Sequence, residues 1–548
     1  MRKRRAYPPP DVNPSGSDIY ASINIQVPTA SRAGTNDDGS STDGFETGKD
    51  YENTVNDVTV VLATKDASSG QYTYRTHATT GNATNAETNT YTLKFDVNAL
   101  NDCAGESLYI FTYCNVTPPI ESWQANFADI ITSEAPWTSD SFIMANASGK
   151  AIPSVTIDNI DDLRKDHSTP ESAFDLGTVD VSRVCSRFDY KKYTADNTYE
   201  VKSIINDAKM GEIELIAMAP IEVATEYYYI PRVSADGTNT SWVYGGNERN
   251  NYVVSPYYDL KKAATLGSEI LSKYKYRTSG TGVDLSSTTA YTWTTLSSWT
   301  GEDDNDDNWN DADGGDGFDK TNYKIWTYVP ENTIPAINAQ KQGISTGVLF
   351  KAKIKSATDP KFSNAMTAGK AIYEFEGTIY GDVEMLRHSA YAADRNSKLY
   401  KKFVDVFGTA CLEIQEGTGS GSDVVFKNTI SDATEQMNAK GDNNKPVFKI
   451  YRPTLENGTN NYYVYYIYRN RHNDNNLATT MGMMEFGTVR NNIYKLMVTK
   501  VSNFGFTSKP GDDPDFPDPD DPDEEKNAYF KVSCRVLNWM VRVNNIPF

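Results

Sequence analysis

The residues that most suggest chemistry form an acidic, Gly-rich run at 302–317, with the sequence EDDNDDNWNDADGGDG. Carboxylate and amide oxygens with tight Gly turns suit Ca²⁺, and the candidate ligands are Asp303, Asp306, Asp311 and Asp313. The EF-hand pattern fails because the twelfth position counted from Asp311 is Asn322, where that loop needs a bidentate Glu. A solvated acidic loop is the favoured interpretation, and we predict no bound metal.

Histidine and cysteine offer little for catalysis. The four histidines, His77, His167, His388 and His472, lie far apart, and none is near a nucleophile motif. The five cysteines form no CxxC pair and no metal-ligand spacing, and small buried residues are the favoured interpretation. We therefore predict that the chain is not an enzyme and carries no cofactor. The odd number of cysteines leaves the disulfide state open. They are Cys103, Cys114, Cys185, Cys411 and Cys534.

A strand pattern stands near the start of the chain, after a Pro-, Gly- and Ser-rich leader at residues 1–17. Apolar residues alternate through it, as in a half-buried strand, and they are Ile19, Ala21, Ile23, Ile25 and Val27. Pro28 stops the pattern, and a polar stretch from 29 to 49 follows, with Arg32 and Ala33 inside it. The strand is thus joined to the rest of the chain by a loop that is easy to cut.

A second isolated strand pattern ends the chain. Residues 509–523 form an Asp/Pro spacer, which we expect to be stiff and held away from the body, reaching about 45 Å at about 3.1 Å per residue. Residues 529–543 beyond it alternate again, and a change of phase between Val536 and Leu537 predicts a bulge or two successive short strands. The pattern alone leaves two possibilities open, docking on its own domain or on a partner. Its apolar residues are Phe530, Val532, Cys534, Val536, Leu537, Trp539, Val541 and Val543.

The body between these segments is predicted to be mainly β. It is rich in Tyr, with 35 residues, and short alternating runs outnumber helical patterns. Polar turns separate the runs, as in an antiparallel sandwich. Expected strands include 58–64, 91–97, 108–113, 179–190, 212–218, 348–354, 462–468 and 493–501, and 258–275 is the best helix candidate. The net charge of −20 argues against a nucleic-acid partner.

The chain resembles the Bacteroidales fimbrillins, the subunits of type V pili. The matching segments occur in order along almost the whole chain, and singly each is weak. They are 17–27 followed by Ser31-Arg32-Ala33-Gly34, the strand 181–187, Gly211-Glu212-Ile213, 489–494, the Asp/Pro spacer and 536–541. The stretch from about 230 to 345 matches least.

The resemblance implies a fold of two transthyretin-like antiparallel β-sandwich domains, with a removable first strand and a C-terminal donor strand. The expected divisions are a leader at 1–17, a first strand with its cleavable segment at 18–32, sandwich domains at 33–192 and 193–508, a spacer at 509–526 and donor strands at 527–548. An arginine-specific surface protease would cut between Arg32 and Ala33, and the C-terminal strand of the next subunit would replace the strand that leaves.

The resemblance also implies partners and a location. The partners would be identical or related fimbrial subunits in a head-to-tail polymer, tip and anchor subunits, and the protease. The location would be a fimbria at the cell surface, reached as a lipoprotein through the periplasm and outer membrane. The lipobox Cys of the family is absent, so no residue is assigned to lipidation.

Two alternative functions remain beside a shaft subunit. A tip subunit needs no C-terminal donor strand, and an anchor subunit needs no N-terminal cut. This chain has the sequence pattern of a donor strand and that of a cut segment, which favours a shaft subunit. A surface glycan-binding lipoprotein would leave the Arg32 segment and the tail strand without a purpose.

Overall fold

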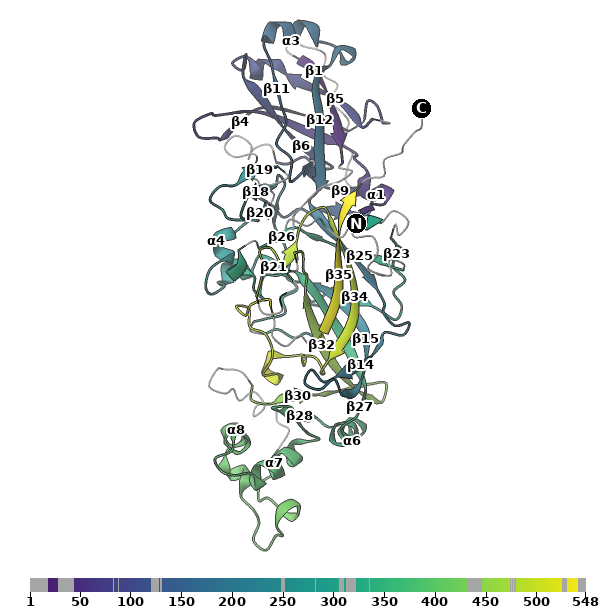
Figure 1. Cartoon of the computed structure of the whole chain (residues 1–548), viewed down its shortest axis with the longest axis vertical. Coiled ribbons are helices and arrows are strands. Elements are labelled where there is room, and N and C mark those ends of the chain that lie inside the picture. The colour runs from purple at the N-terminus through teal and green to yellow at the C-terminus, as the bar shows by residue number, and fades with distance from the viewer. Residues whose placement is uncertain are drawn as a thin grey trace.

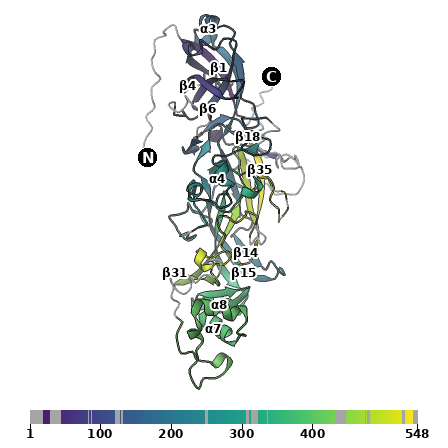
Figure 2. The ribbon, with the colours of Figure 1, turned by 90° about the vertical axis from the view of Figure 1, so that its left-hand side faces the viewer.

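The computed structural model describes residues 18–27, 44–81, 83–86, 88–119, 128, 131–247, 252–280, 282–304, 310–311, 322–334, 336–430, 446–473, 475, 477, 480–524 and 530–540. These form an elongated molecule with two large sheets in sequence along its length, and a small helical lobe at the far end (Figure 1). Figure 2 shows the same order from the side. Mainly β structure is therefore confirmed. No helix in the described part is both long and apolar enough to cross a membrane.

The N-terminal sheet contains eight strands in the order β4-β3-β6-β10-β12-β1-β5, with β11 paired to β6. It folds over so that β5, β1 and β12 cover β3 and β6, and the apolar side chains between the two layers make one core. The bounds are β1 Asp18–Gln26, β3 Val58–Lys65, β4 Tyr72–Thr80, β5 Thr90–Asp96, β6 Ser107–Cys114, β10 Met144–Asn146, β11 Ser154–Thr156 and β12 Phe174–Arg183. Helix α3, Ile160–Asp166, covers one end.

The central sheet has thirteen strands, with the main order β23-β25-β13-β34-β14-β15-β27-β32-β31. Strands β2 and β35 extend it beside β34, β24 pairs with β2, and β22 pairs with β15. The bounds are β2 Gly44–Thr47, β13 Cys185–Lys191, β14 Thr198–Lys202, β15 Lys209–Ile221, β22 Thr294–Thr295, β23 Glu302–Asp303, β24 Asn310–Asp311, β25 Lys324–Pro330, β27 Gly347–Ala357, β31 Pro453–Glu456, β32 Thr459–Arg469, β34 Asn492–Ser502 and β35 Phe530–Met540. The Tyr-rich run in β32 is mostly buried, so its side chains pack on both faces of the sheet.

Small two- and three-stranded sheets fill the loops around the central sheet. They pair β7 (Ile131–Thr132) with β17 (Tyr227–Tyr228), β8 (Trp137–Thr138) with β9 (Ser141–Phe142), β16 (Val223–Ala224) with β21 (Tyr274–Lys275), β26 (Asn332–Thr333) with β33 (Gly487–Thr488), and β18 (Arg232–Ser234) with β19 (Val243–Tyr244) and β20 (Tyr252–Val253).

The helical lobe is an insertion between β27 and β31 that sequence reasoning missed. It contains α6 Pro360–Ala368, α7 Val383–Ala392, α8 Lys398–Phe407 and the sheet of β28 Ile372–Phe375, β29 Thr378–Tyr380 and β30 Lys449–Tyr451. Its own apolar core includes Leu386 and Phe403, both fully buried. Asp359 caps α6 with Pro360 in its first turn, and Asp382 and Ser397 cap the other two helices.

Two expected elements differ in the structure. The prediction of one helix at 258–275 is wrong. Only two short helices form there, α4 Tyr258–Lys261 and α5 Ser268–Leu271, and Gly267 is the N-cap residue of α5. The strand expected at 179–190 is two strands, β12 and β13, separated by Val184 alone, and they belong to different sheets. The change of sheet therefore falls at Val184, before the domain boundary expected at 192.

Candidate functional site

The first strand, β1, lies between β12 and β5 in the N-terminal sheet. It pairs in parallel with β12, with Ile25 opposite Val179, and in antiparallel with β5, with Ile23 opposite Tyr91. The pairing with β12 has a register shift between Ser22 and Asn24, whereas the pairing with β5 is regular from Asp18 to Asn24. A strand near the start of the chain therefore fills a gap between two strands that follow it much later in the sequence.

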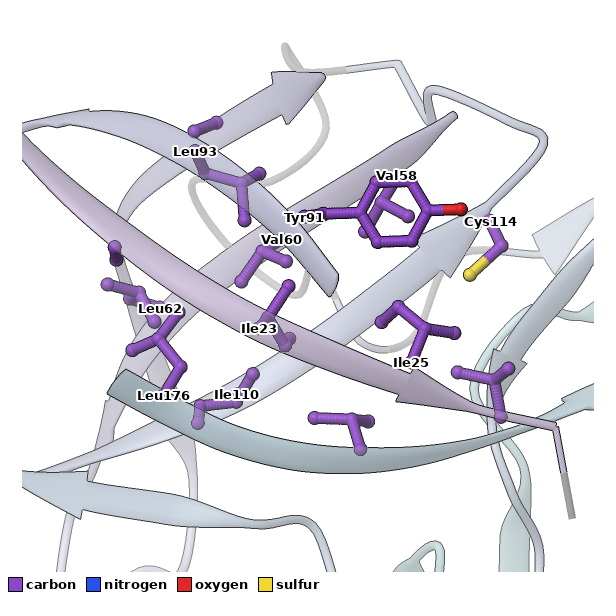
Figure 3. Close-up of a cluster of buried hydrophobic side chains, with 14 of the residues drawn as sticks. Ile23, Ile25, Val58, Val60, Leu62, Tyr91, Leu93, Ile110, Cys114 and Leu176 are labelled. Carbon is purple, nitrogen blue, oxygen red and sulfur yellow. The ribbon is translucent and has the colours of Figure 1, made fainter. Parts of the chain in front are cut away.

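The apolar face of β1 is part of the core. All five predicted residues are at most 6% exposed. Ile23 and Ile25 point toward side chains of β3, β5 and β6 (Figure 3). At about 1.5–3 kcal/mol for each large apolar side chain, the face contributes on the order of 10 kcal/mol. Its residues are Ile19, Ala21, Ile23, Ile25 and Val27.

Few side-chain bonds add to this apolar contact. An ion pair joins Asp18 to Lys94 at 2.8 Å, and the Asn24 amide donates to the backbone oxygen of Thr88 at 2.5 Å. The backbone nitrogen of Tyr20 also donates to the oxygen of His167 at 2.8 Å. Burial and the two ladders thus hold β1, and loss of the strand would leave an apolar groove between β5 and β12.

The predicted processing residues, Arg32 and Ala33, lie outside the described residues. The chain resumes at β2, which is held against the central sheet by a buried ion cluster. The Arg187 guanidinium contacts Glu46, Glu52 at 3.0 Å and Asp189 at 2.8 Å, and all four side chains are fully buried. The Tyr328 hydroxyl donates to Glu52 at 2.5 Å. The segment after the expected cut thus has an anchor of its own, independent of β1.

Lys495 completes this ion cluster. Glu46, Asp189 and Asp304 bring carboxylate oxygens within 4.8 Å of one another, a spacing that could hold a cation, and the Lys495 ammonium contacts all three. Burial alone would raise the pKa of Asp189, but Arg187 and Lys495 hold that pKa below its ordinary value. The lysine occupies the place that a metal would take. Sequence reasoning missed the cluster because its members are far apart in the chain.

Two of the four candidate calcium ligands, Asp303 and Asp311, lie in the described part of the chain. Asp303 is exposed and forms an ion pair with Lys324, and Asp311 lies in β24, opposite Gly44 of β2. Asp306 and Asp313 lie outside the described residues.

The tail strand, β35, is docked on its own molecule. It pairs in antiparallel with β34 from Phe530 to Asn538, and in parallel with β2 through residues 538–540. Figure 1 shows β35 beside β34 in the central sheet. Val532 packs against the central core. The predicted donor residues from Phe530 to Trp539 thus lie in this strand, and Val541 and Val543 lie outside the described residues.

The irregularity expected at Val536 and Leu537 does not occur there. These two residues pair in regular order with Tyr494 and Ile493. The register shift lies in β34, between Val498 and Lys500, opposite Val532 and Lys531. The change of phase in the sequence therefore does not divide β35 into two strands.

The Asp/Pro spacer is not held away from the body, as the sequence led us to expect. Residues 509–524, which we call the strap, lie against the central sheet and its loops. Asp512 and Asp513 are at most 5% exposed, and Phe516 is buried with its ring 5.7 Å from that of Phe506. Clustered Asp side chains repel one another only when they are unpaired, and here Arg452, Lys449 and backbone amides pair with these carboxylates.

The comparisons with solved structures give several long matches of low identity. A candidate cell adhesion protein from Parabacteroides distasonis is 9% identical over 97% of this chain and 99% of its own, with a TM-score of 0.37. The fimbrilin FimA from Porphyromonas gingivalis is 12% identical over 96% and 98%, with a TM-score of 0.35. The tip fimbrial protein Mfa3 from the same organism is 10% identical over 95% and 100%, with a TM-score of 0.28. No curated protein sequence matches the chain.

A family model matches the C-terminal part of the chain, over residues 456–545. This range contains β32, β34, the strap and β35. The match confirms the resemblance drawn from the sequence. By this match, the chain carries the C-terminal region of fimbrillin, the major fimbrial subunit protein type IV family.

Proposed function

We propose that this chain is a shaft subunit of a cell-surface fimbria and that it polymerises by exchange of β-strands after a proteolytic cut. A surface protease cuts after Arg32, β1 leaves, and the tail strand of another copy enters the groove between β5 and β12. The family match supports a fimbrial subunit. Export as a lipoprotein through the periplasm and outer membrane is part of the same proposal.

The observation that carries this proposal is the position of β1. It is a strand of nine residues near the chain start that completes a core between two later strands. The tail strand, with eleven residues, is long enough to replace it. An incoming strand would recover both the apolar burial and the backbone ladders, as in strand addition to an open sheet.

The docked tail strand explains why exchange needs the cut. Before cleavage, β1 fills the groove between β5 and β12, and β35 is paired with β34 and, at residues 538–540, with β2, so the groove is closed to another strand. After cleavage, β35 separates from β34 and β2 and enters the groove of a neighbouring copy. Burial of its apolar side chains in that groove compensates for the free energy lost with the old pairing. A contact between a tail and a groove of different copies is head-to-tail, which builds open fibres.

The test is assembly after cleavage. Purified protein is treated with an Arg-specific protease and run on a denaturing gel without boiling. A ladder is expected, and it should be absent when residues 527–548 are deleted or when Arg32 is changed to Ala. Monomer that persists after a verified cut at Arg32 would sink the proposal.

A further inference from the structure

The strap, residues 509–524, is bound to its own molecule along its whole length. At its start, the Arg452 guanidinium donates to both oxygens of Asp512 at 2.8 Å. Asp513 contacts Lys449 at 3.3 Å and accepts from the backbone nitrogen of Thr507 at 2.9 Å. These cations belong to β30 and to the chain just after it, so the strap is fixed at the base of the helical lobe.

The second half of the strap is bound through its backbone. The nitrogen of Gly343 donates to the oxygen of Pro519 at 2.9 Å, and a Cβ added at Gly343 would lie 2.8 Å from the Pro519 ring. Lys341 and Pro522 face each other in an antiparallel bridge. Two backbones approach this closely when a segment is docked as a strand. The second half of the strap is therefore docked and is not a loose tether.

The strap ends in a buried polar contact. Asp523 is 4% exposed, accepts a bond from Ser345, and donates from its backbone nitrogen to the oxygen of Gln340 at 3.2 Å. The Arg471 guanidinium then contacts Glu524 at 2.9 Å. The fixed part of the chain therefore extends to Glu524.

Covalent geometry limits how far the tail strand can reach from Glu524. Residues 525–529 separate Glu524 from the first residue of β35, and an extended chain of that length spans about 20 Å. If the whole spacer came free, the reach would be several times longer. The two cases predict different spacing between a donor and its acceptor.

We propose that the strap stays bound to its own molecule when the tail strand is donated, so the accepting copy packs directly against the body beside Glu524. This inference rests on the proposed exchange of strands. The spacer is then the fixed segment from which the tail strand extends, and not a flexible tether. The accepting copy must then contact the surface from which the tail leaves.

Two exposed apolar side chains mark that surface. Ile337 is 44% exposed and Leu477 is 57% exposed. Their loops meet at Gln340, whose side chain donates to the oxygens of Ile337 at 3.4 Å and Gly482 at 2.7 Å. The backbone oxygen of the same Gln340 accepts from Asp523. A second copy held within about 20 Å of Glu524 would cover these side chains.

Two matched disulfides test the strap. In a Cys411→Ser background, Lys341→Cys with Pro522→Cys locks the strap to the body across the antiparallel bridge. Leu496→Cys locks the tail strand instead, because Leu496 faces the native Cys534 in the β34–β35 pairing. Each variant is cut at Arg32, and its ladder is compared before and after reduction, with disulfide formation verified by mass.

The strap-locked protein should form the same ladder oxidised and reduced, whereas the tail-locked protein should form one only after reduction. A strap-locked protein that assembles only after reduction would overturn the inference while leaving strand exchange intact. Absence of a ladder from the reduced parent after a verified cut would instead remove the exchange model, and this inference with it.

The contact surface has its own test. Ile337→Asp with Leu477→Asp should slow ladder formation by about tenfold or more, while the cut protein still binds a synthetic peptide of residues 527–548 as tightly as the parent. The control is Ile205→Asp, since Ile205 is 91% exposed far along the chain from this surface, and it should assemble normally. Normal assembly of the double variant would overturn the contact.

Discussion

Lys495 and Arg187 lie fully buried among Glu46, Glu52, Asp189 and Asp304. Burial would lower the pKa of Lys495, but the charges of Asp189 and Glu46 hold it above its ordinary value. Removal of one charge from such a cluster strongly destabilises the protein, because the opposite charges that remain are buried away from water and have lost their partner. It joins β2, β13, β34 and the loop after β23, so it holds the first segment after the expected cut against the central sheet.

Lys495→Met should therefore destabilise the protein by roughly 3–5 kcal/mol, because three carboxylates lose a shared cation. Chemical unfolding followed by circular dichroism measures the change. Lys398→Met is the matched control, because Lys398 and its partner Glu376 are both more than half exposed, and it should cost less than about 1 kcal/mol. Equal effects of the two substitutions would contradict a structural role for the cluster.

The strap should dock less tightly as pH rises. Burial raises the pKa of Asp523 to about 7, against the nearby charges of Arg469 and Arg471. A carboxyl whose pKa is higher when docked favours docking while it is protonated, so this contribution is full below the ordinary Asp value of about 4 and is lost as pH rises to about 7.

Hydrogen exchange across residues 509–524, corrected for intrinsic rates, measures this dependence. Asp523→Asn removes the titrating group and should flatten the curve between about pH 4 and pH 7. The remaining slope belongs to Asp513, whose pKa burial also raises. An unchanged slope in the Asn variant would show that Asp523 is not responsible.

The strands β1 and β35 have similar alternating sequence patterns but different neighbours in their sheets. β1 has later strands on both sides along its length, whereas β35 has β34 on one side and only the short β2 on the other. The strand near the chain start is therefore the more deeply embedded of the two. Dilution alone should not release β1, because its apolar face would then be exposed to water. Its removal therefore requires another strand that competes for the same groove.

Ile23→Ala tests how much β1 contributes. Ile23 is fully buried, so the substitution should cost about 2–5 kcal/mol through lost burial and a cavity. Gln26→Ala, at the exposed end of the same strand, should cost less than about 0.5 kcal/mol. The two are compared by thermal unfolding of the uncut protein. Similar costs would mean that the alternation does not decide which residues hold the strand.

Strands with strict alternation could be predicted from sequence, and β1 and β5 were found because period two is a local signal. Their neighbours could not be predicted, since Val179 and Tyr91 lie far along the chain from the residues that they face in β1. The helices of the lobe had local signals that sequence reasoning passed over, such as Asp359-Pro360 before α6 and Gly369 after it.

The strap shows why composition misleads. A run of Asp and Pro has the same composition whether it is solvated or docked, and the difference lies in cations at Lys341, Lys449, Arg452 and Arg471. None of these is near in sequence to its carboxylate. Only the fold brings them together, so composition alone predicted a free tether.

At the scale of the whole molecule, a cut need not separate the parts. After cleavage at Arg32, the fragment that contains β1 should remain bound, because its burial is unchanged and only a loop is broken. In a protein from which residues 527–548 are deleted, so that no tail strand competes, the fragment and residues 33–526 should elute together in gel filtration and separate in denaturant. Arg32→Ala, treated in the same way, should stay a single chain on a denaturing gel. Immediate loss of the fragment from the cut protein would contradict the strength estimated for this contact.

One residue, Val184, separates the last strand of the N-terminal sheet from the first strand of the central sheet. Its backbone bonds to Ile143 on one side and Glu331 on the other, and Arg183 beside it is buried against the backbone oxygen of Glu52. No loop is present at this point to act as a hinge. Each molecule should therefore resist bending as a single rod, and a filament built from it would owe its curvature to the joints between copies.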